Sequence, residues 1–302
     1  MNYKSCNICP HKCKIDRSKT PSGFCKSSDK AIISSICIHN GEEPVISGKK
    51  GICNVFFAHC NMQCIYCQNY EISRNTNLNF KDYSVEDLAD RIIKTLENTE
   101  QIVGFVSPSH FVPFICEIID YIRNKGTNPI FVYNSNGFDS VESLKELDGK
   151  IDVYLPDFKY SNDDLAYKLS GIKNYPEIAL MAIKEMYRQK GSSLFINNES
   201  GIAESGLIIR HLLLPGFLEN SKNVLNLIAN EISTSLNISL MSQYFPPLKI
   251  EKEESLNRKI TKQEYLELIE TFQKLGFYKG WIQDIESNKT YCPKIENNII
   301  SF

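Results

Sequence analysis

The chain has 302 residues, of which 42% are apolar and 23% charged, proportions of a folded globular protein that exclude a disordered one. Thirty-four basic and thirty-six acidic side chains leave a net charge of −2, so composition gives no indication of nucleic-acid binding. No apolar run reaches the ~18 residues of a membrane span. The first residues also lack the apolar core of a signal peptide, so we expect a cytoplasmic protein.

Nine of the eleven cysteines lie in the first 67 residues. In a cytosolic chain of this length, clustered cysteines are more often metal ligands or redox groups than disulfides. Cys6, Cys9, Cys13 and Cys25 supply four thiolates, enough for a zinc tetrahedron or a 4Fe–4S cube, and His11 could replace one of them. Their segment has few large apolar side chains, so a metal would hold it together. Free thiols on a mobile tail are the alternative.

From residue 51 onward, short apolar runs alternate with amphipathic segments. The runs are rich in Val, Ile, Phe and Tyr, and most are too continuously apolar for a sheet with one face in water. We therefore expect six buried strands, at 52–58, 101–107, 129–134, 151–157, 207–213 and 238–244.

The helices between these strands have recognisable starts. Ser84 with Asp87 three residues later predicts the beginning of one helix, and Thr261 with Glu264 predicts another. The polar stretch 246–260 is expected to be a solvated connection.

Six strand–helix units predict a parallel sheet with right-handed crossovers. Six are fewer than the eight of a closed barrel, so we expect an α/β fold with a partial (β/α)6 TIM-like barrel. A flat doubly wound sheet is the alternative, but its first turn would be rich in glycine, where this chain has cysteines. The expected parts are a Cys-rich, metal-binding N-terminal segment (1–50), the barrel (51–245), and a C-terminal helix and tail that cover it (246–302).

Three cysteines follow the first predicted barrel strand, Cys60, Cys64 and Cys67, in HCNMQCIYCQN. Three thiolates this close can hold one 4Fe–4S cluster and leave one iron open to a substrate. The loop leaves the carboxyl end of a strand, where barrel enzymes carry their chemistry. The alternatives are a structural zinc site with a fourth ligand such as His59, or reduced surface thiols.

This triplet, with Tyr66 before its last cysteine, resembles that of the radical S-adenosylmethionine superfamily. The pyruvate formate-lyase-activating-enzyme-like subfamily has blocks similar to GEEPVISGKKG, FFAHCNMQCIYCQNYEIS, FVSPSHFVP, VYNSNGFDSVESLKELDG, DVYLPDFKY, RHLLLPG and MSQYFP. The resemblance implies a cluster whose open iron binds S-adenosylmethionine and whose electron cleaves it to a 5′-deoxyadenosyl radical, which abstracts hydrogen from a substrate. It also implies a one-electron donor such as flavodoxin or ferredoxin.

The resemblance further implies cofactor contacts at the strand ends. Asn134 begins a run that matches a D-T-N-G-like run of activating enzymes, and Asp157 begins one that matches their D-x-K. These runs surround the cofactor carboxylate in the family, in some members with a monovalent cation, although Asn in place of Asp removes a charge that a cation would use. The expected cofactor-binding residues are Tyr66, Ser107, Ser109, Asn134, Ser135, Asp157, Lys159 and Arg210.

Three residues are expected to contact the substrate. Asn69 matches a position near the bound peptide in activating enzymes. His110 is either an active-site group or a buried, hydrogen-bonded histidine. Arg210 and His211 are adjacent in a strand, so only one of them can point into the barrel.

The sequence leaves two substrate classes open. An enzyme that activates a glycyl-radical protein needs an open cleft for a glycine loop, whereas a catalyst that modifies a small molecule or a peptide side chain would use a covered cavity. Both ends of the chain carry aromatic residues and cysteines, such as Trp281, Tyr291 and Cys292, which favours a covered cavity. A zinc- or iron-binding regulatory module without catalysis is the non-enzyme alternative.

Overall fold

The computed structural model describes residues 3–20, 22–76, 80–286, 294–296 and 299–301. The strands are β1 (Ala31–His39), β2 (Ile52–Phe57), β3 (Lys81–Tyr83), β4 (Ile102–Val106), β5 (Ile130–Ser135), β6 (Val153–Pro156), β7 (Phe195–Ile196), β8 (Ala203–Leu212), β9 (Asn237–Met241), β10 (Gly280–Ile282), β11 (Lys294–Glu296) and β12 (Ile299–Ser301). The helices are α1 (Pro44–Ser47), α2 (Tyr70–Ser73), α3 (Val85–Leu96), α4 (Val112–Asn124), α5 (Val141–Glu146), α6 (Asp163–Ser170), α7 (Tyr175–Lys190), α8 (Leu218–Glu231) and α9 (Lys262–Lys274).

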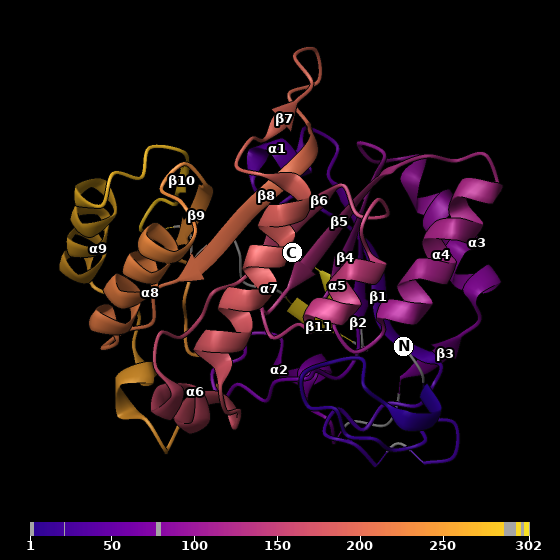
Figure 1. Ribbon diagram of the computed structural model, residues 1–302, viewed down its shortest axis with the longest axis horizontal. Coiled ribbons are helices and arrows are strands. Elements are labelled where there is room, and N and C mark those ends of the chain that lie inside the picture. Colours follow the sequence, from indigo (N-terminus) through magenta and orange to yellow (C-terminus); the bar gives the residue numbers. More distant parts are fainter. Residues whose placement is uncertain (1–2, 21, 77–79, 287–293, 297–298, 302) are drawn as a thin grey trace.

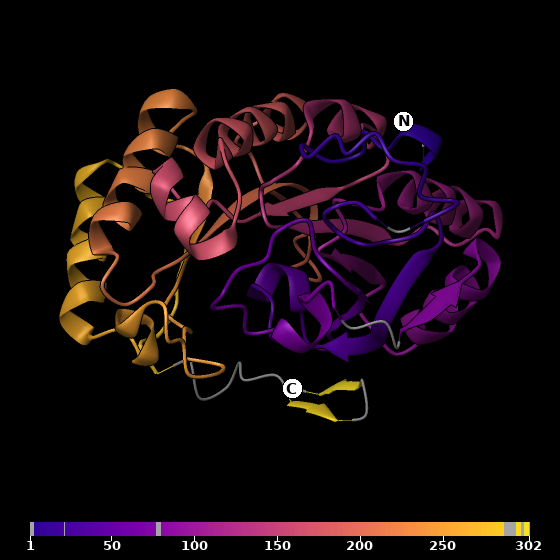
Figure 2. The same ribbon diagram turned by 90° about the horizontal axis from the view of Figure 1, so that it is seen from below.

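The six expected strands form the centre of one sheet, as β2, β4, β5, β6, β8 and β9. They are parallel, and each lies beside the next in chain order. Right-handed crossovers that always step in one direction place every connecting helix on the same face. Figure 2 shows these helices as an arc around the curved sheet. This arrangement confirms the partial (β/α)6 barrel and excludes the doubly wound sheet, whose strand order reverses.

The sheet extends beyond the six units at both edges (Figure 1). β1 pairs antiparallel with β2 and carries β3 on its other side, while β10 pairs parallel with β9. β1 lies within the expected segment 1–50, which therefore contributes an edge strand as well as cysteines. The division into 1–50, 51–245 and 246–302 stays a proposal.

The local signals for helix starts are confirmed. The Ser84 side chain accepts a hydrogen bond from the Asp87 backbone at the first turn of α3. Thr261 and Glu264 form a reciprocal capping box at α9. Both pairs satisfy backbone N–H groups that a helix end would otherwise leave without a partner.

Apolar side chains cover both faces of the barrel strands. Val55, Phe105 and Tyr133 belong to the large core between the sheet and the outer helices. On the inner face, a second cluster closes the amino end of the barrel; it contains Ile46, Ile52, Ile102, Val132, Val153, Leu155, Ile202, Ala203 and Ile208. Burial on two faces explains why the strand sequences are continuously apolar.

The stretch 246–260 differs from the expected solvated connection. Ile250, Leu256 and Ile260 are buried, and the Tyr244 hydroxyl donates to the Leu256 carbonyl oxygen at 2.8 Å. These apolar residues are irregularly spaced among charged ones, so no periodic signal predicts their burial.

Residues 3–20 and 22–30 pack against the barrel without strands of their own. Arg17 holds this segment, because its guanidinium donates to the backbone oxygens of Ser27, Ser28 and His110 and is only 1% exposed. In the part of the chain that the structure describes, no helix has both the length and the apolar composition that crossing a membrane requires.

Candidate active site at the carboxyl end of the sheet

The loop after β2 carries the three clustered cysteines, and each sulfur accepts a hydrogen bond from a side chain of a different element. The donors are Asn136 to Cys60 (3.4 Å), Ser170 to Cys64 (3.0 Å) and Ser73 to Cys67 (3.2 Å). They lie after β5, at the end of α6 and at the end of α2. The fold therefore brings one polar group to every sulfur of the triplet.

The backbone of this loop is fixed on both sides of Cys64. The N–H groups of Gln63 and Ile65 donate to the last two carbonyl oxygens of α6, at 3.3 and 2.9 Å. Asn75 accepts from the Cys60 backbone N–H at 3.0 Å and donates to the Cys60 carbonyl oxygen at 3.1 Å. The positions of the sulfurs thus depend on the packing of α6 and of the turn after α2.

The environment of the sulfurs is poor in positive charge. Burial raises the pKa of the Cys60 thiol to about 12, and burial together with Cys64 raises the pKa of Cys67. Burial would lower the pKa of Lys159, but Asp157, Cys64 and Cys67 together raise it, so this ammonium lies near the thiols. Thiolates crowded in this way require a cationic partner, which the irons of a cluster supply.

Among the described residues, no three Cys, His, Asp or Glu side chains surround a point that would hold a single metal ion. A 4Fe–4S cube makes a different demand, because each thiolate binds a different iron. The donor set of the loop, three thiolates with hydrogen-bond donors, fits that chemistry.

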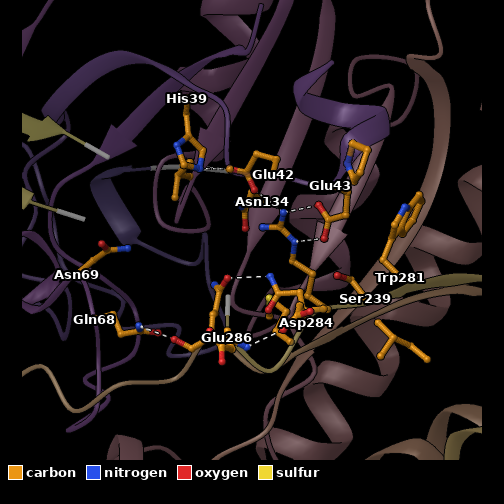
Figure 3. A pocket seen from close by; sticks show the side chains of 18 of the residues that line it. His39, Glu42, Glu43, Gln68, Asn69, Asn134, Ser239, Trp281, Asp284 and Glu286 are labelled. Atoms are coloured by element: carbon orange, nitrogen blue, oxygen red, sulfur yellow. Dashed lines mark hydrogen bonds and ion pairs between the residues drawn. The ribbon is translucent and has the colours of Figure 1, made fainter. Parts of the chain in front are cut away.

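A cavity of about 660 Å³ lies beside this loop, on the concave side of the sheet. Gln68 and Asn69, directly after Cys67, form part of its wall, and Figure 3 shows them across the cavity from Trp281. Asn134 from β5 and Ser239 from β9 also line it. The cavity therefore has an amide-rich wall at the edge where the strands end.

Arg210 points into the barrel and forms the floor of the cavity with two carboxylates. Its Nε donates to Glu43 at 2.9 Å, and its terminal nitrogen contacts both Glu42 and Glu43. Burial opposes ionisation of Glu42, but Arg210 and His39 outweigh it and lower the pKa of Glu42 to about 2. The guanidinium is therefore engaged within the protein, although the sequence predicts it as a cofactor contact.

Glu42 and Glu43 were not predicted as site residues. They belong to the block GEEPVISGKKG, which, like the cysteine loop, resembles the family. That resemblance was the sequence signal that could have identified them as site residues. Figure 3 shows both side chains, from the segment before α1, at the cavity.

The ends of β5 and β6 lie close together because of one glycine. Gly137 has a φ of +78°, and a Cβ there would lie 2.2 Å from the Asp157 carbonyl oxygen. Asp157 continues the inward-facing series of β6, and its carboxylate accepts from Lys159 Nζ at 2.5 Å. The two runs that sequence similarity assigns to the cofactor are thus neighbours in space.

Other predicted residues lie away from the cavity. His211 is buried on the opposite face of β8, with Nδ1 2.6 Å from the Phe158 carbonyl oxygen. His110 is buried with Nε2 3.2 Å from the Ala58 carbonyl oxygen, and burial lowers its pKa to about 3. Of the two expectations for His110, the structure matches the buried, hydrogen-bonded histidine. Neither histidine lines the cavity.

The predicted serines also serve the fold. Ser135 donates to Asp139 at 2.6 Å, and Ser109 is 1% exposed, with its hydroxyl near the same carboxylate. The Ser107 backbone N–H donates to the Asn134 carbonyl oxygen, in a left-handed conformation with φ of +55°. Tyr66 is buried, with its hydroxyl oxygen 2.7 Å from that of Tyr160.

The four N-terminal cysteines gather beside the barrel. The pKa of the Cys9 thiol is raised, and burial is the largest cause. Cys25, Cys6 and Cys13 lie close enough to Cys9 to raise its pKa further. His11 does not turn its Nε2 toward them, because that atom lies 2.8 Å from the Asn61 carbonyl oxygen. His11 thereby joins the N-terminal segment to the cysteine loop.

Comparison with known proteins identifies the family of this chain. The sequence model of the Radical SAM superfamily matches residues 54–228, from β2 to α8. An uncharacterized protein of Methanocaldococcus jannaschii is 30% identical over 278 residues, which cover 90% of this chain and 75% of that protein.

Two solved structures are similar in fold. A C140S mutant of spore photoproduct lyase has a TM-score of 0.51 at 11% identity, with 81% of this chain and 77% of that chain covered. HydG, a maturase of the [FeFe]-hydrogenase, has a TM-score of 0.50 at 13% identity, with 76% of this chain covered. This chain spans 50% of the length of HydG. The match of the superfamily's sequence model to more than half of the chain shows that this protein belongs to the radical SAM superfamily. Enzymes of this superfamily use a 4Fe–4S cluster and an electron donor to cleave S-adenosylmethionine for radical chemistry.

Proposed function

We propose that Cys60, Cys64 and Cys67 hold the 4Fe–4S cluster, and that the adjoining cavity receives S-adenosylmethionine and the substrate. The observation that carries this proposal is the loop itself, whose three sulfurs each accept a side-chain hydrogen bond and whose next residues line the cavity. Three thiolates leave one iron free for the cofactor. When bound, the cluster supplies the electron that splits the cofactor into methionine and a 5′-deoxyadenosyl radical.

Residues at the strand ends would hold the cofactor's polar groups. Asp157 and Lys159 pair with each other beside Cys64 and Cys67. Separated by the cofactor, they would offer a carboxylate to the amino group and an ammonium to the carboxylate of a methionine moiety. Asn134 and Asn69 add amides within the cavity. We do not include Arg210 in this set, because Glu42 and Glu43 already neutralise it.

For the substrate, we propose a small molecule or a peptide side chain. The cavity wall is completed by Trp281, Gln283 and Asp284, which follow α9 and cover the side of the barrel beyond β9. Such a cover suits a substrate that is enclosed during hydrogen abstraction, since a radical must be kept from solvent. Tyr291 and Cys292, which the sequence also assigns to this cover, lie outside the described residues.

Activation of a glycyl-radical protein is the second candidate, and it rests on the resemblance of the cysteine loop and Asn69 to activating enzymes. Electron paramagnetic resonance tests it with any glycyl-radical protein encoded near this gene. A glycyl-radical doublet that depends on Cys64 would establish activation, whereas a genome without such a protein would rule it out. In either case we propose flavodoxin or ferredoxin as the electron donor.

The cluster assignment is tested by anaerobic reconstitution. We expect brown protein with the broad visible absorption of an iron–sulfur cluster, which releases 5′-deoxyadenosine when it is reduced with S-adenosylmethionine. The Cys60/Cys64/Cys67→Ala variant should lose the release of 5′-deoxyadenosine, and Cys116→Ala, which removes a half-buried thiol on α4, should keep it. Wild-type protein that stays colourless and binds only zinc would contradict the proposal.

A further inference from the structure

Cys64 ends a chain of three buried hydroxyl groups behind the cysteine loop. Ser170 Oγ lies 3.0 Å from Cys64 Sγ, the Tyr160 hydroxyl lies 2.5 Å from Ser170 Oγ, and the Tyr66 hydroxyl lies 2.7 Å from that of Tyr160. Ser170 and Tyr160 are fully buried, and Tyr66 is 5% exposed. Solvent therefore offers these hydroxyls little competition.

Packing fixes the chain in place. The Tyr160 ring lies edge-on to Tyr175 at 5.2 Å and to Tyr66 at 6.5 Å, and Tyr66 in turn meets Tyr244 at 6.4 Å. Ser170 is the last residue of α6, and its carbonyl oxygen accepts from the Gln63 backbone beside Cys64. The same helical turn thus holds the loop backbone and places a hydroxyl on the sulfur.

The chemistry of the sulfur sets the direction of the hydrogen bonds. An iron-bound Cys64 sulfur carries no proton, so it can only accept and Ser170 must donate to it. With the cluster bound, Ser170 Oγ can then accept from the Tyr160 hydroxyl, which in this structure is placed as a donor to Tyr66 at 2.7 Å. The O–H groups of Ser170 and Tyr160 then point toward the sulfur, and the bond between them polarises the bond to Cys64.

The other two sulfurs have simpler partners. Cys60 accepts from the amide of Asn136 and from the Met62 backbone N–H, both at 3.4 Å, and Cys67 accepts from the half-buried Ser73 at 3.2 Å. These bonds are longer than the 3.0 Å bond to Cys64, and no chain of further hydroxyls is described behind any of these donors. Cys64 therefore receives the strongest hydrogen bond of the three.

We propose that Ser170, backed by Tyr160 and Tyr66, is a positioning residue that raises the reduction potential of the cluster through Cys64. Hydrogen bonds to cluster sulfurs stabilise the reduced state, which carries one more negative charge. The effect would ease the one-electron reduction that precedes cofactor cleavage. This inference rests on the proposed cluster ligands.

The test is the reduction potential of the reconstituted cluster, followed by electron paramagnetic resonance during a redox titration, with iron content measured on the same samples. Ser170→Ala should shift the potential to more negative values. Tyr160→Phe should shift it in the same direction by less, because Ser170 still donates but is no longer polarised. Ser170→Thr keeps the hydroxyl and should stay near wild type.

Ser161→Ala is the matched control, because this serine lies just before α6 and bonds Asn220 rather than a cysteine. Full iron content with an unchanged potential in Ser170→Ala would overturn the inference and leave the cluster ligands intact. If Ser170→Ala loses iron, the reduction potential of Tyr160→Phe is the deciding measurement. An unchanged potential in Tyr160→Phe would then overturn the inference. Wild-type protein that binds no cluster would instead refute the proposed function.

Discussion

Asp157 ends β6 with its carboxylate 2.5 Å from Lys159 Nζ, beside the sulfurs of the cysteine loop. If this pair binds the polar groups of S-adenosylmethionine, Asp157→Ala should weaken cofactor binding about ten- to a hundredfold, the effect of losing one buried polar partner worth about 1–3 kcal/mol. Iron content should not change, because the carboxylate does not ligate the cluster. Equilibrium binding to the anaerobic, reconstituted protein measures this effect.

Asp148→Ala is the control for that experiment, since Asp148 pairs with Arg188 on the surface. Unchanged cofactor affinity in Asp157→Ala, with normal iron, would show that the end of β6 is not part of the cofactor site.

The ionisation of Glu42 should make the free energy of unfolding depend on pH. The pKa of Glu42 in the folded protein is about 2, below its ordinary value of 4.5. The lowered value means that the contribution of Glu42 to the free energy of unfolding is present above pH ~4.5 and is lost as the pH falls toward 2, with a size on the order of 3 kcal/mol. Glu42→Gln should therefore lose less stability than wild type across this window, as measured by urea unfolding at several pH values.

Glu231→Gln, which changes an exposed pair with Lys184, should keep the wild-type pH profile. If Glu42→Gln also kept the wild-type dependence of stability on pH, the floor of the cavity would not hold an ionised Glu42.

At the scale of elements, β2 and β4 approach each other through Gly104. A Cβ at this position would lie 2.1 Å from Asn54 Oδ1, and the Asn54 amide donates to Glu42 at 2.8 Å. Gly104→Ala should thus cost about 1–3 kcal/mol of unfolding free energy, because the barrel interior has no room for the methyl group.

The double variant Gly104→Ala/Asn54→Ala isolates this contact. Removing the Asn54 amide frees space, so the two costs should not add, and a double-mutant cycle by urea unfolding measures the coupling. Additive costs would indicate that the strain at Gly104 has another source.

The elements around the loop also show why one sequence motif is not a site by itself. Cys60, Cys64 and Cys67 are close in sequence, but their hydrogen-bond donors come from α2, from α6 and from the turn after β5. Substitutions in those elements can therefore change the cluster without touching a ligand.

On the scale of the whole molecule, hydrogen bonds attach the N-terminal segment to the cysteine loop and to the turn after α2. His11 lies 2.8 Å from the Asn61 carbonyl oxygen, and Asn75 donates to the Phe24 carbonyl oxygen at 2.7 Å. We propose that Cys6, Cys9, Cys13 and Cys25 form a second metal site in this segment, holding zinc or a 4Fe–4S cluster. Their side chains would draw together on binding, because no three of them surround one point in the described structure.

Metal analysis of the Cys60/Cys64/Cys67→Ala variant tests this second site. About one retained zinc would identify a structural ion, and about four retained irons a second cluster. Loss of all metal would contradict the proposal, because four N-terminal thiolates should bind independently of the barrel.

Local patterns in the sequence determined the barrel strands, the starts of α3 and α9, and the position of the cysteine loop at the end of β2. These features depend on side-chain periodicity, on capping within one turn and on the spacing of three neighbouring cysteines. The resemblance of the quoted blocks to known enzymes added the cofactor, and the family comparison confirmed it.

Only the tertiary structure decided which side chains meet. Arg210 reaches Glu43 across 167 positions, and Ser170 reaches Cys64 across 106. Strand alternation alone could not say whether Arg210 or His211 faces inward, because that choice depends on the register of β8 against β6 and β9. Contacts of this kind arise from the curvature of the sheet and the docking of α6, and long-range packing of that sort leaves no periodic trace in the sequence.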